Sequence, residues 1–167
     1  MEINSELISK FNNIFIMLHY AIMTNDIERV KHFLSPEMYE KYKKIVDSNI
    51  SNNEIQMYDE LNVKNTEILE YKDFGDHYQV VVRLVSRYMD YIVDLETGKY
   101  KRGINDHRIE KNNILVFEKI KNHISNNGVI TCFNCGANLN VTATGVCPYC
   151  DKIIDLSGID YQLISME

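Results

Sequence analysis

The stretch Tyr78-Gln-Val-Val-Val-Arg-Leu-Val-Ser-Arg-Tyr-Met-Asp-Tyr-Ile-Val93 is typical of a long β-strand whose pattern changes phase midway. Its first part places apolar side chains on alternate positions, as a strand with one buried face requires. These residues are Tyr78, Val80, Val82, Leu84 and Tyr88. From Met89 onward the apolar residues fall on the other parity, at Met89, Tyr91 and Val93. Because such a shift exchanges the two faces of a strand, the pattern predicts a bulge or a sharp bend.

Turn sequences on both sides of this strand predict an antiparallel sheet. Asp73-Phe74-Gly75-Asp76 is typical of a hairpin turn, and it joins a preceding strand at Val63–Tyr71 to Tyr78–Val93. Glu96-Thr97-Gly98-Lys99 predicts the next turn. A last strand is expected at Ile114–Ile120, where apolar residues return.

The region before the strands predicts three helices. Asn4 or Ser5 can cap the first, which ends at Thr24-Asn25-Asp26, and a short second helix follows through Phe33 and Leu34. Ser35 and Pro36 are a helix cap and a first helical residue, so the third helix should run from there to about Asp47. The first helix has a 3.6-residue apolar repeat, formed by Leu7, Ile8, Phe11, Ile14, Phe15, Leu18 and Ile22.

Helices followed by strands predict an α+β domain over residues 1–122. Three helices on one face of a strongly curved antiparallel sheet form the cone-shaped fold of nuclear transport factor two. A polar connection at 123–131 precedes a second, smaller unit at 129–167. The first helix is apolar nearly all round, with Ile16, Met17 and Tyr20 beside its main stripe. Such a helix is either buried or contacts a partner, with a homodimer and a membrane surface as alternatives.

Four cysteines near the end of the chain predict a metal site. Cys132, Cys135, Cys147 and Cys150 form two C-x2-C pairs separated by eleven residues. Zinc prefers four tetrahedral thiolate ligands, and each pair lies on a tight turn that directs two sulfurs to one point. We expect one structural zinc ion in a closed ribbon. Iron in the same ligand set and a redox-active pair are the alternatives.

Charge and hydropathy limit the classes of partner. The net charge is −6, and Lys152 is the single basic residue between positions 128 and 167, so we expect no nucleic-acid partner. Glu2 and Glu6 occupy positions where a signal peptide carries positive charge. The longest apolar run, Ile14–Met23, is too short to span a bilayer. These features predict a cytoplasmic protein with reduced cysteines.

Three side chains are candidates for pocket chemistry. Asp90 and Asp94 lie on the long strand, and either one could point into the cone as a general base. The phase change favours the simpler interpretation, in which both face solvent beside Arg83, Arg87 or Lys99. His19 lies in the most apolar part of the first helix and is expected to be a hydrogen-bonded core histidine. The sequence has neither a glycine-rich phosphate loop nor a Ser-His-Asp signature, so we expect a protein that is not an enzyme.

Several segments resemble one known domain family. They are Asp26–Pro36, the strand end and turn Met89–Lys99, the strand Ile114–Lys119, the cysteine motif Cys132–Cys150 and the ending Asp160–Ser165. Together they resemble bacterial proteins that join a zinc ribbon to the C-terminal domain of mitochondrial inner-membrane translocase subunit forty-four. This resemblance implies the cone fold and a scaffold or adaptor role, with a site near a membrane as one setting. It does not extend to the import role, because the chaperone-recruiting region of that protein has no counterpart here.

The combined expectation is a non-enzymatic, zinc-binding scaffold or adaptor that binds a protein or peptide. The alternative is a small-ligand-binding or catalytic cone domain that uses a pocket carboxylate. Peripheral membrane contact is not favoured, because the acidic balance opposes anionic lipid.

Overall fold

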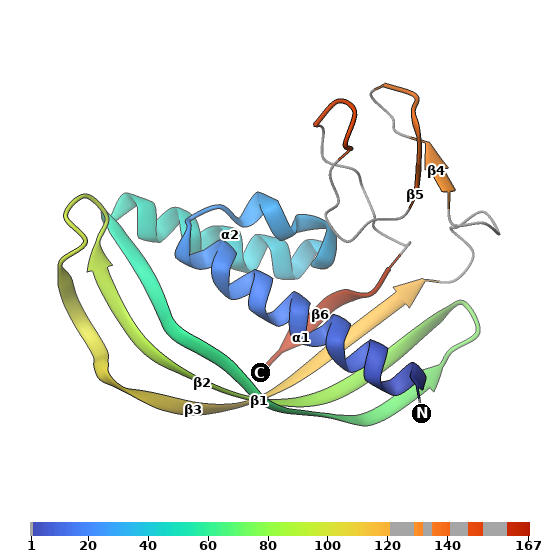
Figure 1. The fold of residues 1–167 in the computed structure, drawn as a ribbon, viewed down its shortest axis with the longest axis horizontal. Helices are drawn as coiled ribbons and strands as arrows, with labels where there is room; N and C mark the ends of the chain where they lie inside the picture. Colours follow the sequence, from blue (N-terminus) through green and yellow to red (C-terminus); the bar gives the residue numbers. More distant parts are fainter. Residues whose placement is uncertain (1, 121–128, 132–134, 141–146, 152–159) are drawn as a thin grey trace.

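Helices and a curved antiparallel sheet form the main part of the molecule in a computed structural model (Figure 1). The structure describes residues 2–120, 129–131, 135–140, 147–151 and 160–167. The helical part comprises α1 (Glu2–Met23), the 3-10 helix η1 (Ile27–Phe33) and α2 (Pro36–Ser51). The strands are β1 (Glu54–Asp73), β2 (His77–Asp94), β3 (Tyr100–Ile120), β4 (Val129–Thr131), β5 (Asn138–Asn140) and β6 (Gln162–Met166). The α+β class with helices first is confirmed.

Local signals define most helix ends. The Ser35 hydroxyl accepts a hydrogen bond from the backbone N–H of Met38 at 3.3 Å, and Pro36 occupies the first helical position, as predicted. The end of α2 at Asp47 was wrong, since the helix continues to Ser51. Ser48, Ile50 and Ser51 in its last turn are exposed, so extending the helix there does not bury their polar groups. Asn53 then takes a positive φ of 57° and reverses the chain.

Four strands form the main sheet in the order β1-β2-β3-β6, with every neighbouring pair antiparallel. The hairpin between β1 and β2 is confirmed, and the Phe74 N–H donates to the His77 carbonyl at 2.9 Å. β1 and β3 begin earlier than expected, at Glu54 and Tyr100. Most side chains of the added part of β3 are exposed, so its hydrogen bonds to β2, rather than burial, hold this part in the sheet.

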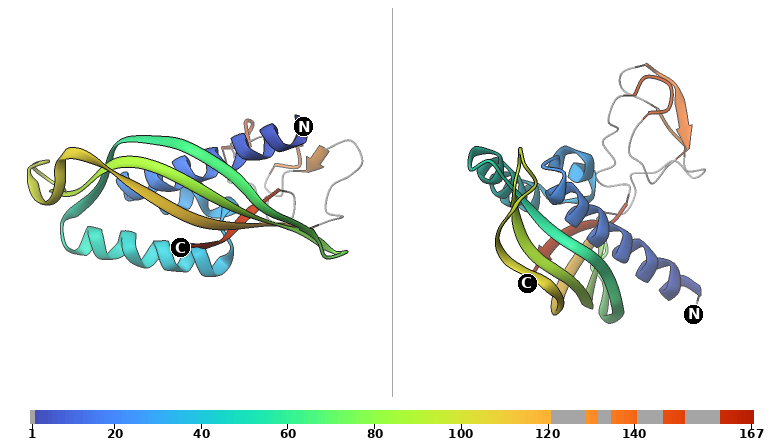
Figure 2. Two further views of the ribbon diagram at one scale, coloured as in Figure 1. Left: turned by 90° about the horizontal axis from the view of Figure 1, so that it is seen from below. Right: turned by 60° about the vertical axis from the view of Figure 1, so that its left-hand side comes forward.

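The bend predicted in β2 is confirmed at Met89. β3 pairs Ile109 with Tyr88 and Ile104 with Asp90, so residues 105–108 lie opposite Met89 alone. β1 is also irregular at this level, where Glu60 has a positive φ of 54°. All three long strands curve together, and both helices lie on the concave side of the sheet (Figure 2).

The core lies between α1 and this concave face. Phe11 is fully buried and stacks on Phe117 of β3 with ring centroids 4.1 Å apart. The predicted alternation on β2 is confirmed, because Val80, Val82 and Leu84 are all fully buried. The α1 stripe is buried from Phe11 to Ile22, so the 3.6-residue repeat predicted its inner face correctly.

The end of the chain returns to the main sheet. β6 pairs with residues 115–118 of β3, and Leu163 is fully buried in the core. On its other side, the Leu163 carbonyl accepts from the Ser35 N–H at 3.0 Å. The range expected for the small C-terminal unit, 129–167, therefore includes a strand of the larger sheet. β4 and β5 pair in a sheet of their own, which stands apart from the main sheet (Figures 1 and 2).

Candidate functional site

Three of the predicted cysteine ligands lie together. The sulfur atoms of Cys135, Cys147 and Cys150 are all within 4.8 Å of one another, and those of Cys135 and Cys147 are 3.7 Å apart. A tetrahedral metal with sulfur ligands at about 2.3 Å requires neighbouring sulfurs about 3.8 Å apart. A disulfide would bring the two sulfurs to about 2.05 Å. The spacing therefore fits a shared metal ion, and these three cysteines could hold one.

Matching turns follow the two cysteine pairs. Gly136, directly after Cys135, has a φ of +74°, and Asp151, directly after Cys150, has a φ of +59°. The Asp151 N–H also donates to the Cys147 carbonyl at 2.9 Å, which closes the second turn. The left-handed conformation of Gly136 therefore recurs at Asp151, the equivalent position of the second pair. The fourth predicted ligand, Cys132, lies outside the described residues.

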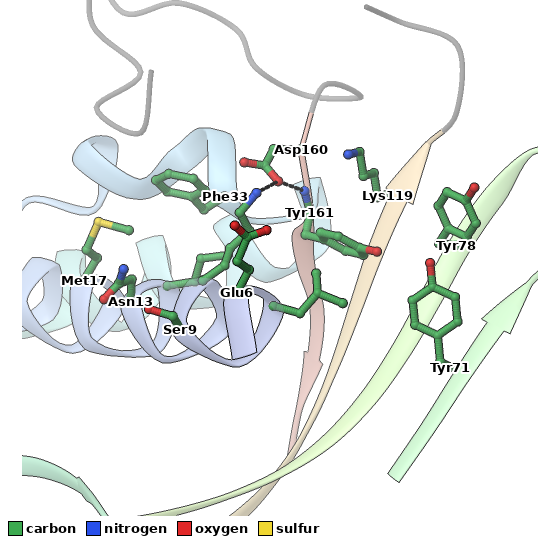
Figure 3. A pocket seen from close by; sticks show the side chains of 13 residues that line it. Glu6, Ser9, Asn13, Met17, Phe33, Tyr71, Tyr78, Lys119, Asp160 and Tyr161 are labelled. Carbon is green, nitrogen blue, oxygen red and sulfur yellow. Dashed lines mark hydrogen bonds and ion pairs between the residues drawn. The ribbon is translucent and has the colours of Figure 1, made fainter. Parts of the chain in front are cut away.

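A separate cleft of about 660 Å³ lies beside the N-terminal half of α1 (Figure 3). The helix forms one wall, and the end of the β1–β2 hairpin, the end of β3 and the start of β6 form the others. Both apolar and polar side chains line it: Glu6, Leu7, Ser9, Lys10, Asn13, Ile14, Met17, Phe33, Tyr71, Tyr78, Lys119, Asp160 and Tyr161. Met17 belongs to the second apolar face of α1, for which burial or contact with a partner was expected. The cleft thus exposes part of that face.

An ion pair joins two walls of the cleft. The Lys10 ammonium lies 2.8 Å from the Asp160 carboxylate, whose exposed fraction is 19%. The same carboxylate oxygen accepts from the Tyr161 N–H at 2.7 Å, and Figure 3 shows both contacts. Asp160 therefore fixes the start of β6 against α1, and Lys10 and Asp160 neutralise each other.

Tyrosines form the end of the cleft near the β1–β2 hairpin. The rings of Tyr71 and Tyr78 are 5.7 Å apart. Burial, together with a hydrogen bond to Tyr71, raises the pKa of Tyr161 above its usual range, so its hydroxyl stays protonated. The Lys119 ammonium lies over the Tyr161 ring, 5.7 Å from its centroid. This end therefore offers aromatic surface, hydroxyl groups and one ammonium to an incoming group.

The two candidate carboxylates on β2 are bound by neighbouring groups. Asp94 accepts hydrogen bonds from the Thr97 N–H at 2.8 Å and from the Thr97 hydroxyl at 3.1 Å. Both bonds lower the pKa of Asp94, and the bond from the Thr97 N–H has the larger effect. Asp90 accepts from the Gln56 amide at 2.7 Å. Both side chains are half-buried, and the partners found for them are Gln56 and the β2–β3 turn, where Arg83, Arg87 or Lys99 had been expected beside them. Asp94 closes the β2–β3 turn, which gives it a structural role.

His19 is a core histidine, in agreement with the interpretation from the sequence. It is 5% exposed, and its Nδ1 lies 2.7 Å from the Phe15 carbonyl. Burial lowers its pKa to about 4, so the ring is neutral at physiological pH. Its ring packs edge-on against Tyr58 at 4.6 Å. These contacts explain the histidine through packing and hydrogen bonding.

The sequence was compared with models of known protein families. A family model described as the Tim44-like domain matches residues 4–128. The chain belongs to the Tim44-like domain family. Tim44-like domains are generally involved in protein interactions. A search of curated proteins found no match. Within the described part of the chain, no helix has the length and apolar character needed to cross a membrane.

The cleft is the feature of this Tim44-like chain that sequence reasoning missed. Lys10, Tyr71, Lys119 and Asp160 come from four elements far apart in the chain. No local sequence spacing connects these residues. They meet through the pairing of β6 with β3, two strands that are far apart in the sequence. The segment Asp160–Ser165 resembles the ending of the family proteins, but nothing in its sequence indicates that it forms a wall of a cleft.

Proposed function

We propose that this chain is an adaptor that binds a peptide segment of a partner protein in the cleft beside α1. In this proposal the cysteine cluster holds one structural zinc ion that organises a small unit within residues 129–167. Adaptor function agrees with the protein-interaction role of Tim44-like domains. We further infer that the main domain is a cone of the nuclear transport factor two type and that the protein acts in the cytoplasm.

The observation that carries this proposal is the composition and shape of the cleft. Its volume of about 660 Å³ falls in the range of sites that enclose small ligands or several side chains. Tyrosine is enriched where proteins bind proteins, because it supplies a large rigid surface with one polar end. Three tyrosines and the apolar residues Leu7, Met17 and Phe33 line this cleft. Such a surface suits the side chains of an extended segment.

Catalysis by a pocket carboxylate is the weaker interpretation. A general base needs a raised pKa near the working pH, and hydrogen bonds hold that of Asp94 below its usual value. Asp160, in the cleft itself, is paired with Lys10. These carboxylates therefore support the fold.

The metal part of the proposal adds Cys132 to the three sulfurs of the cluster. Four thiolates leave no coordination position open, so the ion would stabilise a unit too small to fold on its own core. Zinc is preferred to iron because the tetrahedral thiolate set and the small hairpin are typical of zinc ribbons. The expected content is about one zinc per chain.

Metal analysis of the purified protein tests this part. Mass spectrometry of the native protein should find one zinc, and Cys147→Ser should lose it. Tyr149→Phe is the matched control, because it lies between two ligands and is 73% exposed. A native protein that contains no zinc after expression in zinc-supplied medium would refute the metal assignment. If the protein instead contains iron, the site would be assigned to iron.

Site-specific photo-crosslinking tests the cleft. A photoreactive residue is placed at exposed Ser9 on the cleft, and in a control at exposed Arg83 on β2, which does not line it. The proposal expects a defined partner segment joined from Ser9 and absent from Arg83. That segment, made as a synthetic peptide, should bind the purified chain and lose affinity when Met17→Trp fills the cleft. Equal crosslinks from both positions would refute the cleft as the binding surface.

A further inference from the structure

Lys119 is the cation of the cleft without an acidic partner among the residues that the structure describes. Lys10, the other cation, is neutralised by Asp160 at 2.8 Å. The Lys119 ammonium lies over the face of the Tyr161 ring. A partly buried ammonium over an aromatic ring keeps most of its hydrogen-bonding capacity, since it has three donors and the ring accepts none of them strongly.

We propose that Lys119 receives a carboxylate of the bound peptide, from an Asp or Glu side chain or from a C-terminus. This inference rests on the proposed function and specifies the chemistry of the partner. The side chains of Tyr71 and Tyr78 lie at the same end of the cleft and add aromatic surface around such a group (Figure 3). Lys119 is half-buried, and a charge pair that is partly shielded from water is stronger than a fully exposed one.

The charges on the opposite wall restrict the peptide to a single acidic group. Glu6 lies on the α1 wall of the cleft and forms no ion pair with a basic side chain of the described residues. A second peptide carboxylate beside α1 would be repelled by Glu6, whereas a basic or neutral residue there is accepted. The expected segment therefore has one acid at the Lys119 end, apolar residues against Leu7 and Met17, and no acidic run.

The experiment selects peptides from a random display library on three purified, zinc-supplied full-length chains. These are the native protein, Lys119→Glu, and the matched control Lys111→Glu, which changes an exposed lysine of β3 outside the cleft. Circular dichroism and thermal unfolding check that both variants fold. Selected peptides are then synthesised with Glu or Gln at the acidic position, each as a free acid and as a C-terminal amide, and titrated by fluorescence anisotropy.

The proposal expects native selections enriched in one Asp or Glu, and Lys119→Glu selections enriched in Lys or Arg at that position. Replacing the acid by Gln should weaken binding about fivefold to tenfold in the native chain and leave it unchanged in Lys119→Glu. A loss caused by amidation instead would assign the carboxylate to the C-terminus. Lys111→Glu should behave as the native chain does.

The two hypotheses fail in different ways. Peptides that compete for the cleft and show no preference for an acid would overturn the role of Lys119 and leave the adaptor function intact. A chain that selects no peptide, or peptides insensitive to Met17→Trp, would overturn the proposed function and the inference with it. Equal effects of Lys119→Glu and Lys111→Glu would assign the loss to net charge and also refute the role of Lys119.

Discussion

Replacing Gly103 by alanine should destabilise the bend that gives the sheet its concave face. Gly103 lies on β3 with a φ of +108°, a conformation that L-residues rarely adopt. A Cβ at this position would lie 2.6 Å from both the Asp90 carbonyl oxygen and the Tyr91 Cα. These are backbone atoms of the paired strand β2, so they cannot move aside as a flexible side chain would.

Two terms set the magnitude. An L-residue held in an unfavourable backbone region costs about 1–3 kcal/mol. Forcing an extra carbon into a filled space typically costs another 1–3 kcal/mol or so. The expected loss is therefore about 2–6 kcal/mol, a large share of the roughly 5–15 kcal/mol that stabilises a domain. Since such domains lose about 1–3 kcal/mol per molar urea, the unfolding midpoint should fall by about 0.7 M or more.

Urea unfolding followed by circular dichroism measures this loss, with zinc supplied to every sample. Gly98→Ala is the matched control, since Gly98 has a φ of +69° and nothing lies within 4 Å of its added Cβ. It should lose only the conformational term, about 1–2 kcal/mol. If Gly103→Ala costs no more than Gly98→Ala, the close approach of β3 to β2 does not fix the bend and the reasoning is refuted.

Three further perturbations test the core and its charges. Phe11→Ala removes a fully buried ring stacked on β3 and should cost about 3–5 kcal/mol in urea unfolding, whereas exposed Tyr20→Ala should cost under about 1 kcal/mol. Burial lowers the pKa of His19 from 6.5 to about 4, so on acidification the unfolded chain binds a proton at this site before the folded chain does. The free energy of unfolding should therefore fall by about 3 kcal/mol as the pH drops from 6.5 to 4. In His19→Gln, the free energy of unfolding should depend less on pH over this range. Hydrogen bonds from Arg102 and Lys101 lower the pKa of Glu54 from 4.5 to about 2. The contribution of Glu54 to the stability of the fold is therefore present above pH 4.5 and is lost as the pH falls towards 2. Glu54→Gln should be less stable than the native chain at pH 6, and the difference should shrink at pH 2.5.

Features with a local physical cause could be predicted from the sequence. Ser35 and Pro36 define a helix start within two residues, and the hydroxyl of Ser35 forms the expected cap. The bend at Met89 is visible because one buried face imposes strict alternation on β2. The positive φ of Gly136 follows from the tight turn that a C-x2-C pair requires. In each case neighbouring residues in the chain carry both the signal and its cause.

Features that depend on distant pairing could not be predicted in this way. The first half of β3 is charged and mostly exposed, so it lacks the alternation that signals a strand. Its strand conformation comes from β2, which supplies hydrogen-bond partners along one edge. β6 was assigned with the cysteine-rich unit because it follows that unit in sequence, while its pairing partner β3 lies more than forty residues earlier. The partners of Asp90 and Asp94 could not be predicted for the same reason, because they are Gln56 of β1 and the residues of the β2–β3 turn.

The return of β6 to the main sheet links the cleft to the cysteine cluster. Asp160 and Tyr161 line the cleft, and they begin the segment that re-enters the main sheet after the cysteine cluster. The backbone path from Lys119 on one wall to Asp160 on the other therefore runs through Cys135, Cys147 and Cys150. A metal ion that shortens this path would reduce the freedom of both walls in the unfolded and partly unfolded chain, as any cross-link within a loop does. Zinc binding and peptide binding should then be coupled, with each raising the affinity for the other by the same factor.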